Sequence, residues 1–286
     1  MTTSTGRISY QGVPGSYSHQ ACREGFPDWE AVACHSFEGA IAAVHEGRAD
    51  LAMLPVENST YGRVADIHSL LPDSGLHIIG EQFVRVHINL LAVPGAGLSD
   101  IKTAMSHTVL LGQCRSFLKE NGIAQETAAD TAGAAMAVAE AGNPATAALA
   151  SELSAEIYGL EVLARHIEDQ SHNTTRFLVM SPEPKRAPQG DVLTTFVFRV
   201  RNLPAALYKA MGGFATNGVN MIKLESYMVD GHFTATQFYA DIEGHPDDRS
   251  VANALEELEF FTTKLQILGV YPVDQFRRSD MPSLKY

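Results

Sequence analysis

The 286-residue sequence contains few cysteines and no long hydrophobic run, and both absences exclude classes of protein. Its three cysteines, Cys22, Cys34 and Cys114, are odd in number, widely spaced and form no CxxC pair. This pattern argues against a disulfide framework and a structural zinc site, and favours a reducing compartment. No stretch approaches the roughly 18 apolar residues of a membrane-spanning helix, and residues 1–12 lack the basic start and apolar run of a signal peptide. We therefore expect a cytoplasmic protein with no membrane partner.

Positive charge is also scarce. The chain has 21 Lys and Arg against 33 Asp and Glu, a formal net charge of -12. Proteins that bind nucleic acid through its phosphates need the opposite sign, so we expect no nucleic-acid partner. The sequence also lacks a dinucleotide fingerprint, a P-loop lysine, a nucleophile elbow, an HExxH motif and clustered His, Cys or Asp ligands. These absences argue against a nucleotide site and against metal or covalent catalysis.

Up to about residue 180, short apolar runs alternate with helical spacing. Strand-like segments at 8–10, 51–54, 103–105 and 146–150 each lead through polar residues into a helical pattern. Ser16 or Ser18 is expected to cap the first of these helices. The alternation predicts an α/β domain with a mostly parallel sheet. In such sheets, ligands bind where strands lead into helix N-termini, which offer unpaired N–H donors and a partial positive charge.

The C-terminal third has a different pattern. Three prolines among polar residues in 181–190 predict a linker, which we set at 182–191. Beyond it, the pattern predicts the order βαββαβ of a ferredoxin-like sandwich. Its expected elements are strands at 192–200, 219–228, 233–242 and 265–271, a helix begun by Asn202 and Pro204, a hairpin turn at Asp230–Gly231, and a helix at 250–261. Because such small open sheets pair their edges with a second copy, we expect dimerisation.

Polar clusters at the strand-to-helix junctions are the candidate binding elements. For each cluster taken singly, an ordinary capped turn or the start of a strand is the favoured interpretation. Glu57 has no carboxylate partner nearby in sequence, so a two-acid glycosidase mechanism is not indicated. Neutral donors with one arginine suit a small polyanionic organic molecule. The clusters are Gly12–Ser16, Pro55–Gly62, Ser106–His107, Thr131–Ala134 and Asn173–Phe177.

In order along the chain, these segments resemble the prephenate dehydratase family. Gly12–His19 resembles its G-x-x-G-S-Y-S-H opening, and Pro55–Gly62 resembles P-x-E-N-S-x-x-G. Ser106–Cys114 is similar to the S-H-P…Q-C block, with Thr108 in place of the usual proline. The matches are completed by Asp130–Ala135, Tyr158–Leu160 and the N-x-T-R-F signature at Asn173–Phe177.

The resemblance implies a catalytic domain of two lobes and a C-terminal regulatory domain. It implies a catalytic domain at 1–181 that is similar to type 2 periplasmic binding proteins, with one lobe at roughly 1–82 plus 171–181 and the other at 83–170. It implies an ACT domain at 192–286 that binds phenylalanine at a dimer interface. Residues 202–209 resemble the ACT block N-K-P-G-A-L-Y-K, with Ala205 in place of glycine. Residues 225–228 keep only the first half of E-S-R-P, and these departures bear on the strength and sign of the effector response.

The resemblance also implies an activity, the conversion of prephenate to phenylpyruvate, water and carbon dioxide in phenylalanine biosynthesis. This reaction is expected to need no cofactor or metal and to be regulated by phenylalanine. Thr175 is then the expected donor to the leaving hydroxyl, Arg176 the partner of the side-chain carboxylate, and Phe177 a residue that shapes the pocket. The other expected substrate-binding residues are Ser16, Glu57, Asn58, Ser59, Gly62, Ser106, His107, Gln113, Thr131, Ala132, Gly133 and Asn173. The expected phenylalanine-binding residues are Asn202, Ala205, Ala206, Leu207, Asn217, Gly218, Asn220, Glu225 and Ser226.

Two alternatives remain open at this point. Arogenate dehydratase differs only by an amine in place of the side-chain ketone of the substrate. A non-catalytic amino-acid sensor would combine a two-lobed binding protein with an ACT module. The expected assembly is a homodimer or a dimer of dimers formed through the ACT domain.

Overall fold

The computed structural model describes residues 6–185, 190–201, 203–228 and 235–280. The chain forms two compact units, Met1–Val64 with Phe83–Phe177, and Ala65–Gln82 with Leu178–Tyr286. Strands β5 (His77–Arg85) and β11 (Thr174–Ser181) each run from one unit into the other. Among the described residues, no helix is long and apolar enough to cross a membrane.

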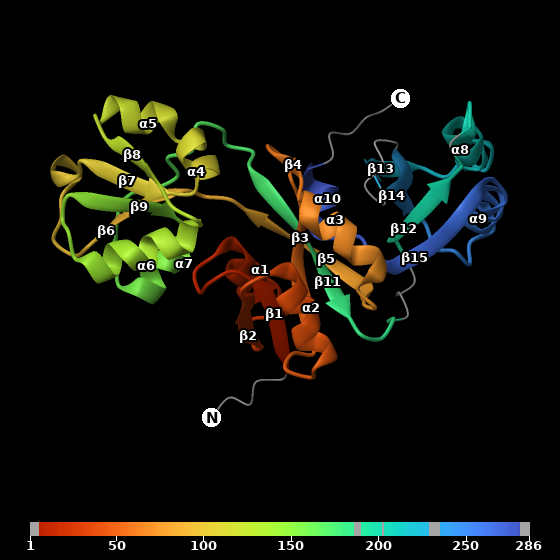
Figure 1. The fold of residues 1–286 in the computed structure, drawn as a ribbon, viewed down its shortest axis with the longest axis horizontal. Helices are drawn as coiled ribbons and strands as arrows, with labels where there is room; N and C mark the ends of the chain where they lie inside the picture. Colours follow the sequence, from red (N-terminus) through yellow and green to blue (C-terminus); the bar gives the residue numbers. More distant parts are fainter. Residues whose placement is uncertain (1–5, 186–189, 202, 229–234, 281–286) are drawn as a thin grey trace. The chain divides into compact units, whose positions relative to one another are not determined.

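The first lobe of the first unit is a small parallel sheet with two helices (Figure 1). Its elements are β1 (Arg7–Gln11), α1 (Tyr17–Gly25), β2 (Glu30–Cys34), α2 (Phe37–His45), β3 (Leu51–Asn58) and β4 (Gly62–Arg63). β1 lies between β2 and β3 and pairs parallel with both, and β11 lies beside β3. Ser16 caps α1 through a hydrogen bond from the His19 backbone N–H, so the predicted helix start is confirmed.

The second lobe of the first unit is a five-stranded sheet with the order β10-β6-β9-β7-β8. Its elements are β6 (Asn89–Ala92), η2 (Leu98–Asp100), β7 (Thr103–Ser106), α4 (Thr108–Gln113), α5 (Arg115–Glu120), β8 (Ala124–Thr127), α6 (Thr131–Ala141), β9 (Thr146–Ala150), α7 (Glu152–Tyr158) and β10 (Glu161–Ala164). Helices cover both faces of this sheet (Figure 1). Leu110 and Leu118 from α4 and α5 pack on one face, and Ala134 and Ala155 from α6 and α7 pack on the other. Burial on both faces explains why β9 is a continuous apolar run.

Two segments connect the lobes, residues 86–88 and residues 167–173, and the second contains a turn at 171–172. They are hydrogen-bonded to each other, because the Val86 N–H donates to the Asn173 carbonyl and the Ile167 N–H donates to the Ile88 carbonyl, both at 2.9 Å. The Glu168 carboxylate adds a side-chain link by accepting the Ile88 N–H at 2.9 Å. The two crossings therefore form one paired connection between the lobes.

The second unit confirms the predicted βαββαβ order. Its elements are α3 (Ala65–Leu70), η1 (Leu71–Asp73), β12 (Val192–Val200), α8 (Ala206–Thr216), β13 (Met221–Met228), β14 (Ala235–Glu243), α9 (Arg249–Phe261), β15 (Thr262–Pro272) and α10 (Gln275–Asp280). The strand order is β13-β14-β12-β15-β5, and Gly269 of β15 pairs with Ile78 of β5. The expected start of the first helix was wrong, because α8 follows Ala205 as its N-cap. Asn202 and the expected turn at Asp230–Gly231 lie outside the described residues.

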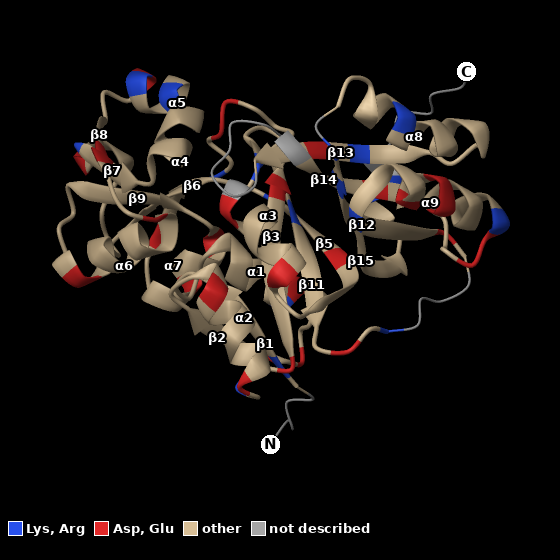
Figure 2. Cartoon of the chain, turned by 45° about the vertical axis from the view of Figure 1, so that its right-hand side comes forward, with Lys and Arg blue, Asp and Glu red and all other residues tan. Residues whose placement is uncertain are grey.

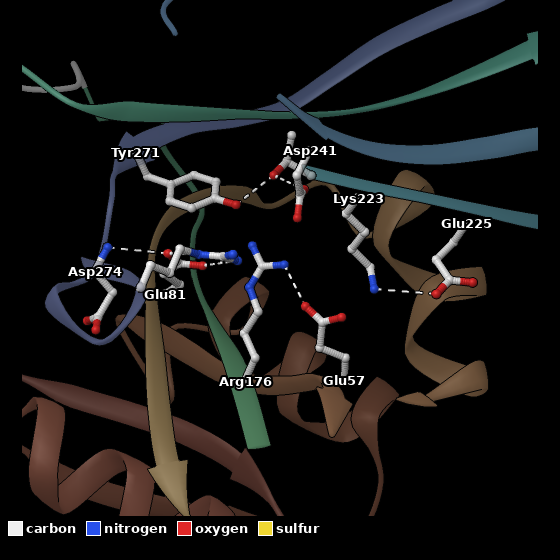
Figure 3. Close-up of polar contacts among 10 residues, drawn as sticks. Glu57, Glu81, Arg176, Lys223, Glu225, Asp241, Tyr271 and Asp274 are labelled. Carbon is white, nitrogen blue, oxygen red and sulfur yellow. Dashed lines mark hydrogen bonds and ion pairs between the residues drawn. The ribbon is translucent and has the colours of Figure 1, made fainter. Parts of the chain in front are cut away.

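The two faces of this sheet differ in chemistry. One face packs Phe196, Phe198 and Phe238 against α8 and α9. The other buries polar groups: the Thr195 hydroxyl donates to the Asp241 carboxylate at 2.6 Å and lies 2.7 Å from the Tyr271 hydroxyl (Figure 3). A carboxylate is tolerated at full burial only when it is hydrogen-bonded. Both faces of this sheet are therefore covered within the unit.

In the view of Figure 2, charged residues of one sign do not gather in a single region. Asp and Glu are spread over the elements of both units, whereas Lys and Arg occur at separate places such as α5 and α8. The excess of acidic residues is thus distributed along the fold.

Candidate functional site

The first unit contains a pocket of about 400 Å³ at the junction of its two lobes. Parallel pairing brings the carboxyl ends of β1, β2 and β3 to one edge of the first sheet, and those of β7, β8 and β9 to one edge of the second. The loops beyond these ends supply the lining. The lining residues are Gln11, Gly12, Val13, Ser16, Tyr17, Ser18, His35, His107, Ala129, Asp130 and Thr131.

Three helices begin at this pocket. Their N-cap residues are Ser16 for α1, His107 for α4 and Asp130 for α6. The first N–H groups of a helix lack intrahelical acceptors and carry a partial positive charge. These N–H groups can bind a small organic anion. The lining contains no Lys or Arg to add charge, and its one charged side chain of fixed sign is the carboxylate of Asp130.

The capping contacts also fix the side chains that face this pocket. The His107 Nδ1 accepts the Val109 N–H at 3.3 Å, which assigns the remaining proton of a neutral ring to Nε2. The Asp130 carboxylate accepts the Gly133 N–H at 2.6 Å. A Cβ at Gly133 would lie 2.8 Å from that carboxylate, so glycine is required beside this cap. Gly133 thus serves the geometry of α6.

The loop after β1 is tied to the second lobe. The hydroxyls of Ser151 and Ser154 donate to the Gly15 carbonyl at 2.6 and 2.9 Å, and the Tyr158 hydroxyl donates to the Pro14 carbonyl at 2.7 Å. Gly15 has φ +91, and a Cβ there would lie 2.6 Å from the Ser154 hydroxyl. These contacts hold one wall of the pocket against α7.

His19 supports the same loop from behind. Its Nδ1 accepts the Gly15 N–H at 3.1 Å, and its ring stacks on Tyr10 at 5.2 Å. Burial, followed by the charge of Arg23, lowers the pKa of His19 from its ordinary value. The neutral ring is therefore the form that fits this structure.

Thr175 lies within a network of amides at the start of β11. The Asn58 Nδ2 donates to the Thr175 hydroxyl oxygen at 3.0 Å and to the Asn173 Oδ1 at 2.6 Å. The Asn173 Nδ2 donates in turn to the Gln113 Oε1 at 3.0 Å. No acceptor for the Thr175 proton is present among the residues that the structure describes. The sequence-predicted residues Asn58, Gln113, Asn173 and Thr175 are thus brought together.

The structure places Arg176 differently from the expectation. Its side chain is only 2% exposed, and its guanidinium donates to the Glu57 carboxylate at 2.9 Å (Figure 3). A buried guanidinium needs a partner inside the protein, and Glu57 supplies one. In this structure Arg176 and Glu57 therefore form an ion pair with each other. Neither residue lines the pocket of about 400 Å³ at which the three helices begin.

Several other expected binding residues serve the fold itself. The Ser106 hydroxyl is fully buried and donates to the Leu149 carbonyl at 2.7 Å. The Ser59 hydroxyl donates to the His172 carbonyl at 2.7 Å and accepts the Thr174 N–H at 2.9 Å. Gly62 has φ +77 and follows the turn between β3 and β4. Ala132 and Phe177 pack in the core, with exposures of 0% and 1%.

The pocket is also lined by His35, Tyr17 and Ser18, which were not predicted from the sequence as binding residues. His35 follows the end of β2, which is parallel to β1, so the carboxyl-end rule applied to β2 was the available signal. Thr60 and Tyr61 line a second pocket of about 140 Å³ beside Gln113. No group of three or more His, Cys, Asp or Glu that could hold a metal occurs in the described part of the chain.

The expected effector residues fall at two ends of α8. Ala205, with φ +61, caps its N-terminus, and Ala206 and Leu207 form its first turn. Asn217 caps the other end and donates to the Glu257 carboxylate at 3.0 Å. The remaining residues lie after this helix and along β13: Gly218 with φ +66, Asn220 bonded to Glu243, Glu225 paired with Lys223, and Ser226.

Comparison with known proteins agrees with this architecture. Residues 8–185 match the family model described as prephenate dehydratase. The chain is 52% identical over 273 residues to a bifunctional N-acyl-homoserine lactone acylase/prephenate dehydratase of Komagataeibacter europaeus, covering 95% of this chain and 97% of the relative. It is 38% identical to an Arabidopsis thaliana arogenate dehydratase/prephenate dehydratase, covering 94% of this chain and 73% of that protein.

A solved structure shows the same fold over nearly the whole length. It is the prephenate dehydratase of Arthrobacter aurescens in complex with L-Phe, 32% identical, with a TM-score of 0.85 and coverage of 97% of this chain and 92% of the other. The mixed α/β architecture with a C-terminal βαββαβ region is therefore confirmed. The chain belongs to the prephenate dehydratase family of hydro-lyases, whose relatives here act on prephenate or arogenate.

Proposed function

We propose that this enzyme converts prephenate to phenylpyruvate in the cytoplasm, as a step of phenylalanine biosynthesis, with Thr175 as the proton donor. The observation that carries the proposal is the contact between Asn58 and Thr175. A hydroxyl has one proton and two lone pairs, and the Asn58 amide hydrogen occupies a lone pair. The Thr175 proton is thereby directed away from Asn58. Thr175 is not among the residues that line the pocket of about 400 Å³, so the proposal requires that the C4 hydroxyl of bound prephenate extend from this pocket to Thr175.

The proposed step breaks two bonds between the ring and its substituents. The bond from C1 to the carboxylate breaks and releases carbon dioxide, and its electron pair enters the ring. The bond from C4 to oxygen breaks in turn, the oxygen leaves with that electron pair and takes the Thr175 proton to give water, and a solvent proton then restores the Thr175 hydroxyl. Because the ring becomes aromatic, the main requirement is a well-placed donor at the leaving oxygen.

The pocket of the first unit supports binding of the prephenate dianion. Ser16, His107 and Thr131 present hydroxyl and ring N–H groups there, and the helix N-termini add backbone donors. Strong cationic pairing with the departing carboxylate would stabilise the ground state that the reaction must destroy. Neutral donors are therefore better suited to this substrate than lysine or arginine.

We also propose regulation by phenylalanine through the C-terminal region, with residues 1–181 catalytic and 192–286 regulatory. Among the expected effector residues that the structure describes, Ala205, Ala206 and Leu207 lie at one end of α8 and Asn217 and Gly218 at the other, whereas Glu225 and Ser226 lie on β13. α8 has 11 residues and is about 16 Å long. One phenylalanine is too short to contact both ends in one chain. The proposal therefore places it between the N-terminal end of α8 in one protomer and the C-terminal end in a second, in a homodimer or a dimer of dimers.

The experiment is an assay for phenylpyruvate from prephenate, run with and without phenylalanine. The proposal predicts turnover by the wild-type chain and a response to phenylalanine of about five- to 150-fold in affinity or activity. Binding heat on phenylalanine titration tests the regulatory part separately. Binding of phenylalanine without any phenylpyruvate would instead support the amino-acid sensor.

Arogenate is the competing substrate, and its product would be phenylalanine. The two substrates differ only at the side-chain ketone or amine, so a comparison of kcat/KM for both decides between them. The proposal predicts the higher value for prephenate.

A second candidate activity is hydrolysis of N-acyl-homoserine lactones. The observation that favours it is the 52% identity to the Komagataeibacter europaeus relative over 95% of this chain. Release of free homoserine lactone from an acylated substrate, measured beside the dehydratase assay, tests it. Failure to release it at enzyme concentrations that turn over prephenate would remove this candidate.

A further inference from the structure

We infer that residues 65–82 transmit the effect of bound phenylalanine from the C-terminal sheet to the first unit, with the contact between His68 and Tyr239 as the required link. The inference rests on the proposed regulation by phenylalanine and identifies the segment that carries it. This coupling segment contains α3, η1 and the first part of β5. None of the binding or catalytic residues expected from the sequence lies within it.

The coupling segment lies in the predicted catalytic domain by sequence but packs with the C-terminal region. It follows the Pro55–Gly62 cluster, which supplies Asn58, and it precedes the crossing between the lobes at 86–88. It forms one compact unit with Leu178–Tyr286. A displacement of this segment therefore reaches the strand that holds Asn58 and the lobe connection through the chain itself.

His68 of α3 is the side chain that meets the C-terminal sheet. It is only 2% exposed, and its ring lies at 89° to the ring of Tyr239 on β14, with the centroids 4.9 Å apart. Tyr239 is fully buried. Its neighbours Phe238 and Ala240 pack on the face that α8 and α9 cover, so alternation places Tyr239 on the opposite, polar face. α3 thus covers this polar face at Tyr239.

Tyr239 connects this contact to an expected effector residue. It pairs with Glu225 of β13 in the antiparallel ladder. Side chains of directly paired residues lie on the same face of a sheet, so Glu225 also points to the polar face. One ladder pair and one ring contact therefore separate an expected phenylalanine-binding residue from the coupling segment.

Other contacts attach the coupling segment to β15. The Gln266 Nε2 donates to the Pro72 carbonyl of η1 at 2.8 Å. Gly269 pairs with Ile78 of β5, and a Cβ at Gly269 would lie 2.1 Å from the Ile78 carbonyl oxygen. Only glycine permits this approach of the two strands. The segment is thus attached to the sheet at η1 and β5 as well as at α3.

A buried ion pair attaches β5 to the chain beyond β15. The Glu81 carboxylate, at 0% exposure, accepts hydrogen bonds from Nε and Nη2 of Arg277 at 2.7 and 3.0 Å. It also accepts the Asp274 N–H at 3.3 Å (Figure 3). A bidentate pair of this kind fixes geometry as well as charge. These contacts hold β5 in place against the C-terminal region.

The contacts to β15 and the contact to β14 have different consequences. β12 lies between β14 and β15 in the sheet, whereas β14 pairs directly with the expected effector strand β13. A shift of β13 and β14 on phenylalanine binding therefore reaches α3 through Tyr239 and His68, while β15 keeps the segment attached. Allosteric coupling requires such an element, whose position both sites influence.

The test substitutes His68 in the full-length chain and measures phenylalanine binding by calorimetry and prephenate turnover with and without saturating phenylalanine. His68→Ala should keep the phenylalanine Kd and the basal kcat within about threefold, and should reduce the response from about five- to 150-fold to less than about twofold. His68→Phe keeps an aromatic ring against Tyr239 and should retain a response of at least about fivefold.

A response of wild-type size in His68→Ala would overturn the inference. Loss of phenylalanine binding in this variant would also overturn it, because His68 would then belong to the binding site. The matched control is Phe198→Leu, which alters the stack of Phe198 on Phe238 on the other face of the same sheet and should keep the response. Loss of the response in both variants would show that any weakening of the sheet suffices, and would contradict the role of His68.

Hydrogen exchange of the wild-type chain tests the inference without a substitution, and decides it if His68→Ala does not fold. Phenylalanine should change the exchange of amides in 65–82. Unchanged exchange there, in a chain whose turnover responds to phenylalanine, would overturn this inference alone. A wild-type chain that forms phenylpyruvate but neither binds nor responds to phenylalanine would contradict the proposed regulation, and this inference with it.

Discussion

The guanidinium of Arg176 lies 2.9 Å from the carboxylate of Glu57, and only 2% of the arginine side chain is exposed. The cation of the Thr175–Phe177 segment is therefore matched within the protein. A buried positive charge needs a negative partner inside the fold. This need, and not only the reaction, explains why an arginine and a glutamate occur in these two distant segments.

This pairing makes a prediction about stability. Glu57→Gln should lower the free energy of unfolding by about 1.5 to 3 kcal/mol, because it removes the charge from the hydrogen-bond partner of a buried guanidinium. Urea unfolding followed by circular dichroism measures it. The matched control is Glu156→Gln, whose partner Arg23 is 50% exposed, and which should change stability by less than about 1 kcal/mol. Equal effects of the two variants would show that burial of the pair has no consequence.

A second prediction concerns pH. Because burial lowers the folded-state pKa of His19, the unfolded chain binds more protons than the folded one near that pKa. The contribution of neutral His19 is then fully present above its unfolded pKa of about 6.5 and is lost as the pH falls through the folded pKa. The free energy of unfolding should decline more between pH 7.5 and 5.5 (about one unit either side of 6.5) in the wild type than in His19→Gln. Parallel pH profiles would refute this assignment.

Ala205 gives a third prediction. Its φ of 61 is in the left-handed region, where a side chain costs about 1 to 2 kcal/mol and glycine does not. After allowance for the greater freedom of glycine in the unfolded chain, Ala205→Gly should raise the free energy of unfolding by about 0.5 to 1 kcal/mol.

The matched control lies in the same helix. Ala215→Gly replaces an exposed residue of α8 and should destabilise by roughly 0.5 to 1 kcal/mol. Opposite signs for the two substitutions are required, and they are read from urea midpoints. Destabilisation by both would mean that Ala205 is not strained.

Much of the fold was predictable because local signals and tertiary structure agree. Ser16 caps α1, as one of the two serines was expected to do, and the apolar run of β9 is buried on both faces. The helix expected from Asn202 and Pro204 begins later, after Ala205, because a left-handed backbone turn precedes it. The available signal was the glycine that usually stands at this position of the ACT block, because glycine favours such a conformation.

The candidate site was predictable only in part. The sequence identified the amides and hydroxyls, since they occur at the junctions between strands and helices. The sequence did not show that the Ser106 hydroxyl donates to Leu149 of the neighbouring strand β9, or that Arg176 pairs with Glu57. Both contacts join residues more than 40 positions apart. His35 was missed because it stands outside every recognisable motif, although the parallel sheet brings it to the pocket.

The account depends most directly on the hydroxyl of Thr175, and steady-state turnover of prephenate by two variants tests it. Thr175→Ser keeps the hydroxyl and should retain kcat within about tenfold, whereas Thr175→Val should lower kcat about 10²- to 10⁴-fold with little change in KM. A Thr175→Val enzyme that forms phenylpyruvate within tenfold of the wild-type rate, about 1.4 kcal/mol in the barrier, would contradict the account.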